Sequence, residues 1–154
     1  MEHREIERKY LIKELPENLD SYPFQRIEQA YLTVDPVIRV RKEGESYYIT
    51  YKGSGLLSRE EYNLPLTESA YETLSKKADG NVIAKKRVLI PYDRYTIELD
   101  IFDPPFAPLI LAEVEFESEE EANSFAPPDW FAEDVTRDTN YHNSTMSRKT
   151  FYTR

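Results

Sequence analysis

Carboxylate, guanidinium and ammonium side chains recur at alternate positions along this chain, and these groups are suited to binding divalent cations and phosphates. The first such segment, Glu5-Ile6-Glu7-Arg8-Lys9, has two carboxylates and one ammonium at every second position. Since side chains alternate between the two faces of a β-strand, Glu5, Glu7 and Lys9 share one face if the segment is extended. So many charged strand faces predict that they line a common space.

The charges on these faces are balanced in sign. The cations are Lys9, Arg39, Arg41, Lys52, Arg59, Lys85 and Arg87, and the carboxylates are Glu5, Glu7, Glu61, Glu98, Asp100, Glu113 and Glu115. If the faces converge, they form a charged lumen that could bind a polyphosphate with its divalent cations. The alternative is that each charged face is simply solvated, while the apolar face opposite packs in the core of an ordinary sandwich.

Eight segments have the patterns of β-strands, which indicates a mostly β fold of the α+β class, built as a barrel or a pair of sheets. The expected strands are 5–12, 27–33, 37–42, 46–52, 59–66, 82–90, 95–102 and 109–117. Turn residues at Asp35-Pro36, Glu43-Gly44-Glu45 and Gly53-Ser54-Gly55 predict tight hairpins, so neighbouring strands are mostly antiparallel. Closure into a barrel would bring the first and last strands together.

Helical segments are expected outside the strands. Residues 69–79 have apolar residues at helical spacing and are followed by Gly80, which we interpret as a C-cap glycine. Ser118 begins a capping-box pattern for a short helix that runs to Phe125. Asn143 is expected to be the N-cap of a short final element, which could cover one mouth of a tunnel.

Length, charge and composition restrict the class of protein. The 154 residues fit a single domain, 1–154, and the net charge of −9 argues against general binding of nucleic acids or anionic membranes. The absence of cysteine excludes disulfides and thiolate chemistry, and the only two histidines, His3 and His142, are too far apart to indicate a histidine metal site. No apolar run approaches the roughly 20 residues needed to span a bilayer, so we expect a cytoplasmic protein.

The segment Glu5-Ile6-Glu7-Arg8-Lys9 resembles the ExExK signature of the CYTH superfamily, also called the triphosphate tunnel metalloenzymes. Further matching segments follow in order over nearly the whole chain: Gln29-Ala30-Tyr31-Leu32, Arg39-Val40-Arg41, Lys52, Arg59-x-Glu61, Lys85-x-Arg87, Glu98-Leu99-Asp100 and Glu113-Val114-Glu115-Phe116-Glu117. This resemblance implies an eight-stranded antiparallel β-barrel, or tunnel, with helices packed outside. The small size and the run Pro127-Pro128-Asp129-Trp130-Phe131 are most similar to the short bacterial branch associated with hydrolysis of inorganic triphosphate.

Carried over by position, the resemblance implies roles for individual residues. Metal ligands for Mg²⁺ or Mn²⁺ would be Glu5, Glu7, Glu113 and Glu115, with Asp100 as an additional ligand. Phosphates would be held by Lys9, Arg39, Arg41, Lys52, Lys85 and Arg87. Arg59 has two equal alternatives, a phosphate contact or a structural ion pair with Glu61.

The resemblance also implies that a water molecule activated beside the metal is the nucleophile. We assign catalytic roles to Glu7 at the metal, Lys9 at a phosphate, and Tyr31. The Tyr31 phenol could orient or deprotonate the water if Lys9 lowered its pKa, although packing is the ordinary role of a strand tyrosine.

The expected activity is hydrolysis of a small-molecule triphosphate, most simply of inorganic triphosphate to pyrophosphate and phosphate. One alternative is a class IV adenylate cyclase, in which the ribose hydroxyl attacks the α-phosphate. A second is a polyphosphate or nucleotide sensor without turnover. A homodimer packed through outward aromatic faces is compatible with this architecture.

Overall fold

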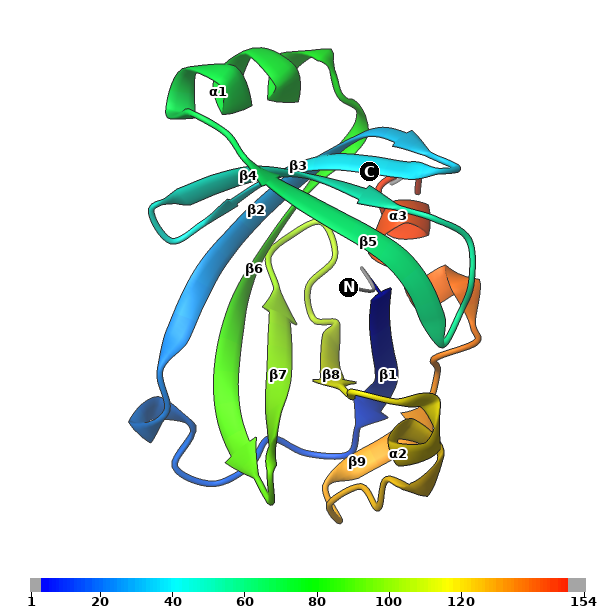
Figure 1. Cartoon of the computed structure of the whole chain (residues 1–154). Coiled ribbons are helices and arrows are strands. Elements are labelled where there is room, and N and C mark those ends of the chain that lie inside the picture. Colours follow the sequence, from blue (N-terminus) through cyan, green and yellow to red (C-terminus); the bar gives the residue numbers. More distant parts are fainter. Residues whose placement is uncertain (1–3, 150–154) are drawn as a thin grey trace.

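The computed structural model describes residues 4–149, which fold into a closed antiparallel β-barrel with short helices outside it (Figure 1). The barrel strands are β1 (Arg4–Ile12), β2 (Phe24–Val34), β3 (Val37–Glu43), β4 (Ser46–Lys52), β5 (Ser58–Pro65), β6 (Asp79–Tyr92), β7 (Tyr95–Phe102) and β8 (Ile110–Glu115). They pair in the order β5-β4-β3-β2-β6-β7-β8-β1, and β1 also pairs with β5, which closes the sheet. The eight-stranded barrel and the meeting of its first and last strands are therefore confirmed.

A ninth strand, β9 (Phe131–Asp134), extends the sheet beyond the barrel, and the sequence patterns did not predict it. It pairs with Tyr10 and Ile12 in the second half of β1, whereas β5 pairs with the first three residues of β1. Because β9 has four residues and follows two prolines, its alternation is too short to recognise.

The helices lie outside the barrel wall, as expected (Figure 1). They are α1 (Glu68–Lys77), α2 (Glu119–Ser124) and α3 (Asn143–Met146), with single 3-10 turns η1 (Leu19–Ser21) and η2 (Thr139–Tyr141). Ser118 caps α2 as predicted, since its Oγ accepts a hydrogen bond from the Glu121 backbone N–H at 3.1 Å. Within residues 4–149, no helix has the length and apolar character needed to cross a bilayer.

The main hydrophobic core lies outside the lumen, because the strands that point charges inward present apolar side chains outward. It contains Val88 and Ile90 of β6, Ile97 and Leu99 of β7, and Ala112 and Val114 of β8. The α2 segment covers this face with Ala122 and Phe125. A second outer cluster joins Tyr71 of α1 to Ala30 and Val40. Each large apolar side chain buried in this way stabilises the fold by about 1.5–3 kcal/mol.

An apolar cluster also occupies one end of the barrel interior. Val37, Ile83, Phe102 and Leu111 each lie two residues from a charged residue and therefore on the same inward face of their strands. Phe106, Val135 and Met146, from outside the barrel strands, complete the cluster together with Tyr31. The charged part of the lumen is thus bounded at one end by apolar packing.

Two local predictions were wrong. Helix α1 ends at Lys77 with Ala78 as its C-cap, and Gly80 instead lies in β6 with φ of 82°. Asn143 is the first residue of α3 and not its N-cap, a position that His142 occupies. The side chain of Asn143 is directed to the barrel interior, where it is hydrogen-bonded to β2 and β6.

Candidate functional site

A cavity of about 230 Å³ occupies the charged part of the barrel. Every residue that the sequence assigned to catalysis, phosphate or metal lines this cavity, with the exception of Asp100. The alternative of separately solvated strand faces is therefore wrong, since the charged faces converge. The segment after β9 adds Thr136, His142, Asn143 and Ser144 to the lining. His3, the other histidine of the chain, lies outside the described residues.

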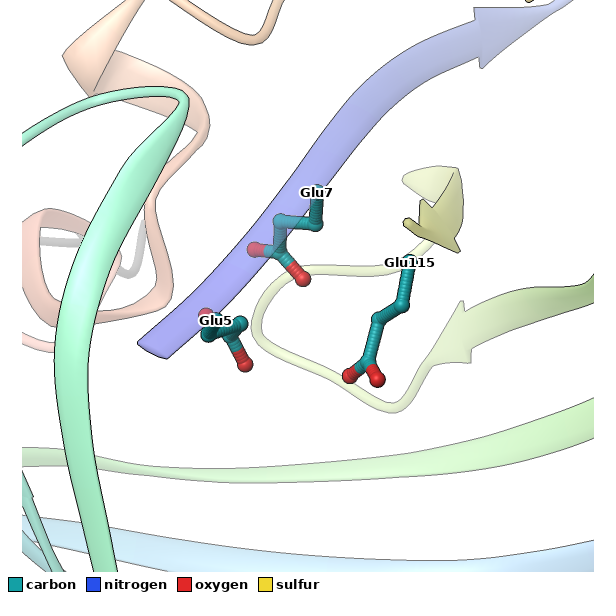
Figure 2. A group of neighbouring side chains, drawn as sticks. All are labelled: Glu5, Glu7 and Glu115. Atoms are coloured by element: carbon teal, nitrogen blue, oxygen red, sulfur yellow. The ribbon is translucent and has the colours of Figure 1, made fainter. Parts of the chain in front are cut away.

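Three carboxylates gather at one side of the cavity. Oxygen atoms of Glu5, Glu7 and Glu115 all lie within 4.8 Å of one another, and Figure 2 shows their side chains from β1 and β8 approaching the same space. In the ladder between these strands, Glu7 is directly opposite Glu115. Glu5 and Glu7 share a face because they are two residues apart in β1.

Burial and repulsion between neighbouring carboxylates disfavour ionisation of Glu7 and Glu115. Burial raises the pKa of Glu7 well above its usual value, and the neighbouring charges of Glu113 and Glu5 raise it further. Burial and the charges of Glu98 and Glu5 raise the pKa of Glu115 to about 7. A set of carboxylate oxygens that repel one another is the donor type that Mg²⁺ and Mn²⁺ prefer, so the residues present fit such an ion.

Lys52 joins the acidic group to β5. Its Nζ donates to Glu5 Oε1 at 2.7 Å and lies 3.3 Å from Glu61 Oε2. Although burial raises the pKa of Glu5, the Lys52 charge and hydrogen bonds from its neighbours lower it to about 2. An ion pair between Arg59 and Glu61, one of the two alternatives for Arg59, is not among the ion pairs of residues 4–149. Arg59 instead lines the cavity, opposite Glu5 in the ladder.

Asp100 is in a different environment from the three clustered glutamates. It is fully buried, and its carboxylate accepts hydrogen bonds from Arg87 Nε at 2.7 Å and Arg87 Nη2 at 2.9 Å. Lys85 Nζ lies 2.7 Å from Asp100 Oδ2. Burial lowers the pKa of Lys85 to about 8, although the Asp100 charge acts in the opposite direction. The oxygens of Asp100 are therefore engaged by two cations of the barrel wall.

Glu113 links the two sides of the site. One of its oxygens lies 3.3 Å from Lys9 Nζ and the other 3.2 Å from Arg87 Nη2. Burial raises the pKa of Glu113, but the charges of Lys9 and Arg87 lower it well below its usual value. Glu113 is thus an ionised carboxylate between cations and does not belong to the group formed by Glu5, Glu7 and Glu115.

Arg39 is a buried cation without a carboxylate within ion-pair distance among residues 4–149. Its side chain is 7% exposed, and its Nε makes no hydrogen bond in the described part of the chain. Burial lowers its pKa, but the Tyr31 phenol and the more distant Glu5 raise it above the usual value. A buried guanidinium is costly unless it is paired, so this one is suited to an anion that enters the cavity.

Gln29 and Asn143 were not assigned roles in the site from the sequence, yet they join several of its side chains. Gln29 is fully buried, accepts a hydrogen bond from Arg41 Nε at 2.7 Å, and donates to Tyr31 at 3.2 Å and to Asn143 at 3.0 Å. The two-residue strand period would have placed Gln29 beside Tyr31. The sequence marked Asn143 only as an N-cap candidate, and no pattern indicated a place in the site, because it reaches the cavity from a segment outside the strands.

Comparisons with known proteins agree with this geometry. The CYTH domain family matches residues 3–151. The inorganic triphosphatase of Nitrosomonas europaea is 39% identical over 149 residues, which cover 93% of this chain and 96% of that protein. The inorganic triphosphatase of Acetivibrio thermocellus is 30% identical and covers 96% of each chain. The crystal structure of the inorganic triphosphatase NE1496 superposes with a TM-score of 0.71 at 33% identity, covering 95% of each chain. The chain therefore belongs to the CYTH domain family.

Proposed function

We propose that this protein hydrolyses inorganic triphosphate to pyrophosphate and phosphate with the aid of Mg²⁺ or Mn²⁺. One observation carries this proposal: a single cavity contains three clustered carboxylates and a buried guanidinium that has no carboxylate partner within the described residues. The two inorganic triphosphatases that match over nearly the whole chain support the same activity. Phosphoryl transfer needs these two functions, the holding of a divalent cation and the neutralisation of several phosphate oxygens.

In this proposal, Glu5, Glu7 and Glu115 hold the metal. When bound, the ion supplies positive charge for phosphate oxygens and lowers the pKa of a water molecule. We do not propose Asp100 as a ligand, because its carboxylate is engaged by Lys85 and Arg87. Glu113 is ionised between Lys9 and Arg87, and we propose that it orients these two cations.

The cations of the cavity bind the phosphate chain. Arg39 and Arg59 have no carboxylate within ion-pair distance among residues 4–149, so a phosphate would be their first direct counterion. Lys9, Arg41, Lys52, Lys85 and Arg87 line the same cavity, and their present carboxylate or amide partners hold them in defined positions. Arginine forks and lysine ammonium groups both suit phosphate oxygens.

Tyr31 and Lys9 are proposed to act on the reacting groups. The Tyr31 hydroxyl accepts a hydrogen bond from Gln29 Nε2 at 3.2 Å, so its own O–H can donate to a phosphate oxygen or a water molecule. Lys9 Nζ donates to the Tyr141 carbonyl at 3.1 Å and lies 3.3 Å from Glu113 Oε1, so its third N–H can point to a phosphate. These two residues therefore orient the attacking water and the phosphoryl group.

The test is a substrate panel assayed with Mg²⁺ and with Mn²⁺. Inorganic triphosphate, ATP and thiamine triphosphate are incubated separately, and the products are measured as phosphate, pyrophosphate and cyclic nucleotide. The proposal expects phosphate and pyrophosphate from inorganic triphosphate in the presence of metal and none with a chelator. Cyclic AMP from ATP with intact triphosphate would support the cyclase, whereas binding without any product would support the sensor.

Several finer properties are part of the same proposal. We propose that residues 1–154 form one functional domain, since the family match extends over residues 3–151. We further propose a cytoplasmic enzyme that acts on small molecules and not on nucleic acids, and a homodimer formed through outward aromatic faces. Sedimentation of the purified protein measures the last of these directly.

A further inference from the structure

We propose that Asn143 is a positioning residue of the tunnel, which orients Lys85 directly and Arg41 through Gln29 for binding of the phosphate chain. This inference rests on the proposed function, because it assigns these two cations to the substrate. Asn143 belongs to α3, outside the barrel wall, yet it lines the cavity and is 8% exposed.

The Asn143 amide oxygen is the meeting point of two strands. Its Oδ1 accepts a hydrogen bond from Lys85 Nζ of β6 at 3.0 Å and another from Gln29 Nε2 of β2 at 3.0 Å. Since both partners are donors, the orientation of the Asn143 amide follows from the network. One side chain of the C-terminal segment therefore holds side chains from two neighbouring strands.

Lys85 needs such an acceptor because it is 1% exposed and carries three N–H groups. Asp100 Oδ2 is 2.7 Å from Nζ and Asn143 Oδ1 is 3.0 Å from it. Two of the three N–H groups are thereby directed to protein acceptors, and the third can donate to an anion in the cavity that Lys85 lines. Without Asn143, the ammonium would rotate about its contact with Asp100 and lose this direction.

The effect on Arg41 passes through Gln29. Gln29 donates to Asn143 and to Tyr31, so its Oε1 is turned to Arg41 Nε, which donates to it at 2.7 Å. With this contact in place, Nη1 of Arg41 lies 3.4 Å from the Tyr48 hydroxyl and 3.5 Å from Glu43 Oε1 at the cavity wall. Loss of the Asn143 acceptor frees the Gln29 amide to reorient, and Arg41 then loses its fixed partner.

The C-terminal segment is also anchored at a second place, which provides a matched control. Asn81 at the start of β6 donates from Nδ2 to the carbonyls of Lys149 at 2.7 Å and Met146 at 3.5 Å. These contacts hold the same segment but do not involve the cavity lining. A variant at Asn81 therefore weakens docking of the segment without removing the acceptor for Lys85.

The experiment compares the parent protein with Asn143→Leu, Asn143→Asp and Asn81→Ala. Thermal stability, kcat and KM for inorganic triphosphate with Mg²⁺ are measured, together with triphosphate binding by calorimetry in a chelator. Asn143→Leu is expected to lower kcat/KM by about tenfold to hundredfold per folded molecule, as misplaced binding groups do. Asn143→Asp retains an acceptor, so its kcat exceeds that of Asn143→Leu, while its negative charge raises KM.

Asn81→Ala is expected to lower the melting temperature and to leave kcat/KM within about twofold of the parent value, since the cations keep their partners. If Asn81→Ala lowers kcat/KM as much as Asn143→Leu, docking of the segment explains the effect and the positioning role is overturned. It is also overturned if Asn143→Leu keeps the parent kcat/KM and the parent affinity.

The binding measurement separates this inference from the proposed hydrolysis. If the parent binds triphosphate but releases no product, the hydrolase proposal fails, and a weaker affinity of Asn143→Leu still supports positioning. If the parent neither binds nor hydrolyses triphosphate, both proposals are overturned.

Discussion

Glu7 and Glu115 lie directly opposite each other in the antiparallel ladder between β1 and β8, and Glu5 brings a third carboxylate to the same place. Like charges at opposed positions of a sheet destabilise it. The raised pKa of Glu7, and that of Glu115 at about 7, have the same origin in burial and repulsion. A divalent cation would remove this repulsion, which links metal binding to the stability of the barrel.

We therefore expect Glu115→Gln to stabilise the metal-free protein and to weaken its response to metal. At pH 8 most Glu115 side chains are ionised, because this pH is above their pKa of about 7. Removal of the charge relieves repulsion worth about 0.2–1 kcal/mol. Melting temperatures in a chelator and in Mg²⁺ measure both effects.

Glu133→Gln, at an exposed position of β9, is the control and should change neither the stability of the metal-free protein nor its response to Mg²⁺. An unchanged response of Glu115→Gln to Mg²⁺ would remove Glu115 from the proposed site.

Asp100→Asn separates a structural carboxylate from a metal ligand. The substitution leaves Lys85 and Arg87 buried without their shared counterion, so we expect a loss of about 3–5 kcal/mol in the free energy of unfolding. Mg²⁺ affinity, measured by calorimetry, should remain. Asp79→Asn, in an exposed ion pair with Arg148, is the control and should cost less than about 1 kcal/mol. Lost Mg²⁺ affinity with unchanged stability would identify Asp100 as a ligand.

The barrel could be predicted from the sequence because its signal is local. In β7 and β8 the charged residues alternate with apolar ones, for example Glu98 with Leu99 and Glu113 with Val114. The sequence of each strand therefore shows by itself which face is charged and which is apolar. Gly80 shows where this local reading fails. Its position after a helical segment suggested a cap, whereas contact with Ser147, far along the chain, requires the glycine.

The partners of the site residues could not be predicted, because they depend on strand register. Alternation places Arg59, Glu61 and Lys52 on inward faces but does not determine that Lys52 stands opposite Glu61. For the same reason, the sequence offered Glu115 as a metal ligand and Asp100 as an additional one, and only the register distinguishes their surroundings, because it places Asp100 opposite Arg87 and Glu115 opposite Glu7. Asn143 depends on tertiary packing alone.

Lys85 should produce an alkaline limit in the pH profile of kcat/KM, which reports groups of the free enzyme. Burial lowers the pKa of Lys85 to about 8, so above this pH the ammonium loses its charge and its attraction for phosphate. We expect kcat/KM for inorganic triphosphate to fall as pH rises through 8. Lys85→Arg keeps its charge, so its decline should begin at higher pH even if its maximal rate is lower. Identical alkaline limits in both proteins would exclude Lys85 as the cause.

Deprotonation of Lys85 should stabilise the fold over the same pH range in which it lowers kcat/KM. A fall in activity above pH 8 can therefore be distinguished from unfolding. In the unfolded chain Lys85 keeps its proton up to about its ordinary pKa of 10.5, whereas in the folded protein it releases the proton near 8. Between these values the unfolded state binds more protons, so the contribution of Lys85 to the free energy of unfolding rises with pH. Denaturant unfolding of parent and Lys85→Met at pH 7.5 and 9.5 measures it. The stability of the parent relative to Lys85→Met should increase from pH 7.5 to pH 9.5, because only the parent carries the titrating group.

Gly80→Ala should disrupt docking of the C-terminal segment on β6. Gly80 has φ of 82°, and a Cβ there would lie 2.3 Å from the Ser147 carbonyl oxygen, so backbone must move. Gly44 provides the matched control, because its φ of 59° is also positive but no atom lies within 4 Å of an added Cβ. Gly44→Ala should therefore cost about 1–2 kcal/mol from backbone conformation alone, and Gly80→Ala should cost more. The Ser147 backbone that the added Cβ displaces belongs to the segment that carries Asn143. Unlike Asn81→Ala, which removes an anchor without forcing a shift, Gly80→Ala should therefore move Asn143 and lower kcat/KM for triphosphate, whereas Gly44→Ala should not. Equal losses of stability in the two variants, measured by denaturant unfolding, would show that contact with Ser147 adds nothing to the strain at Gly80.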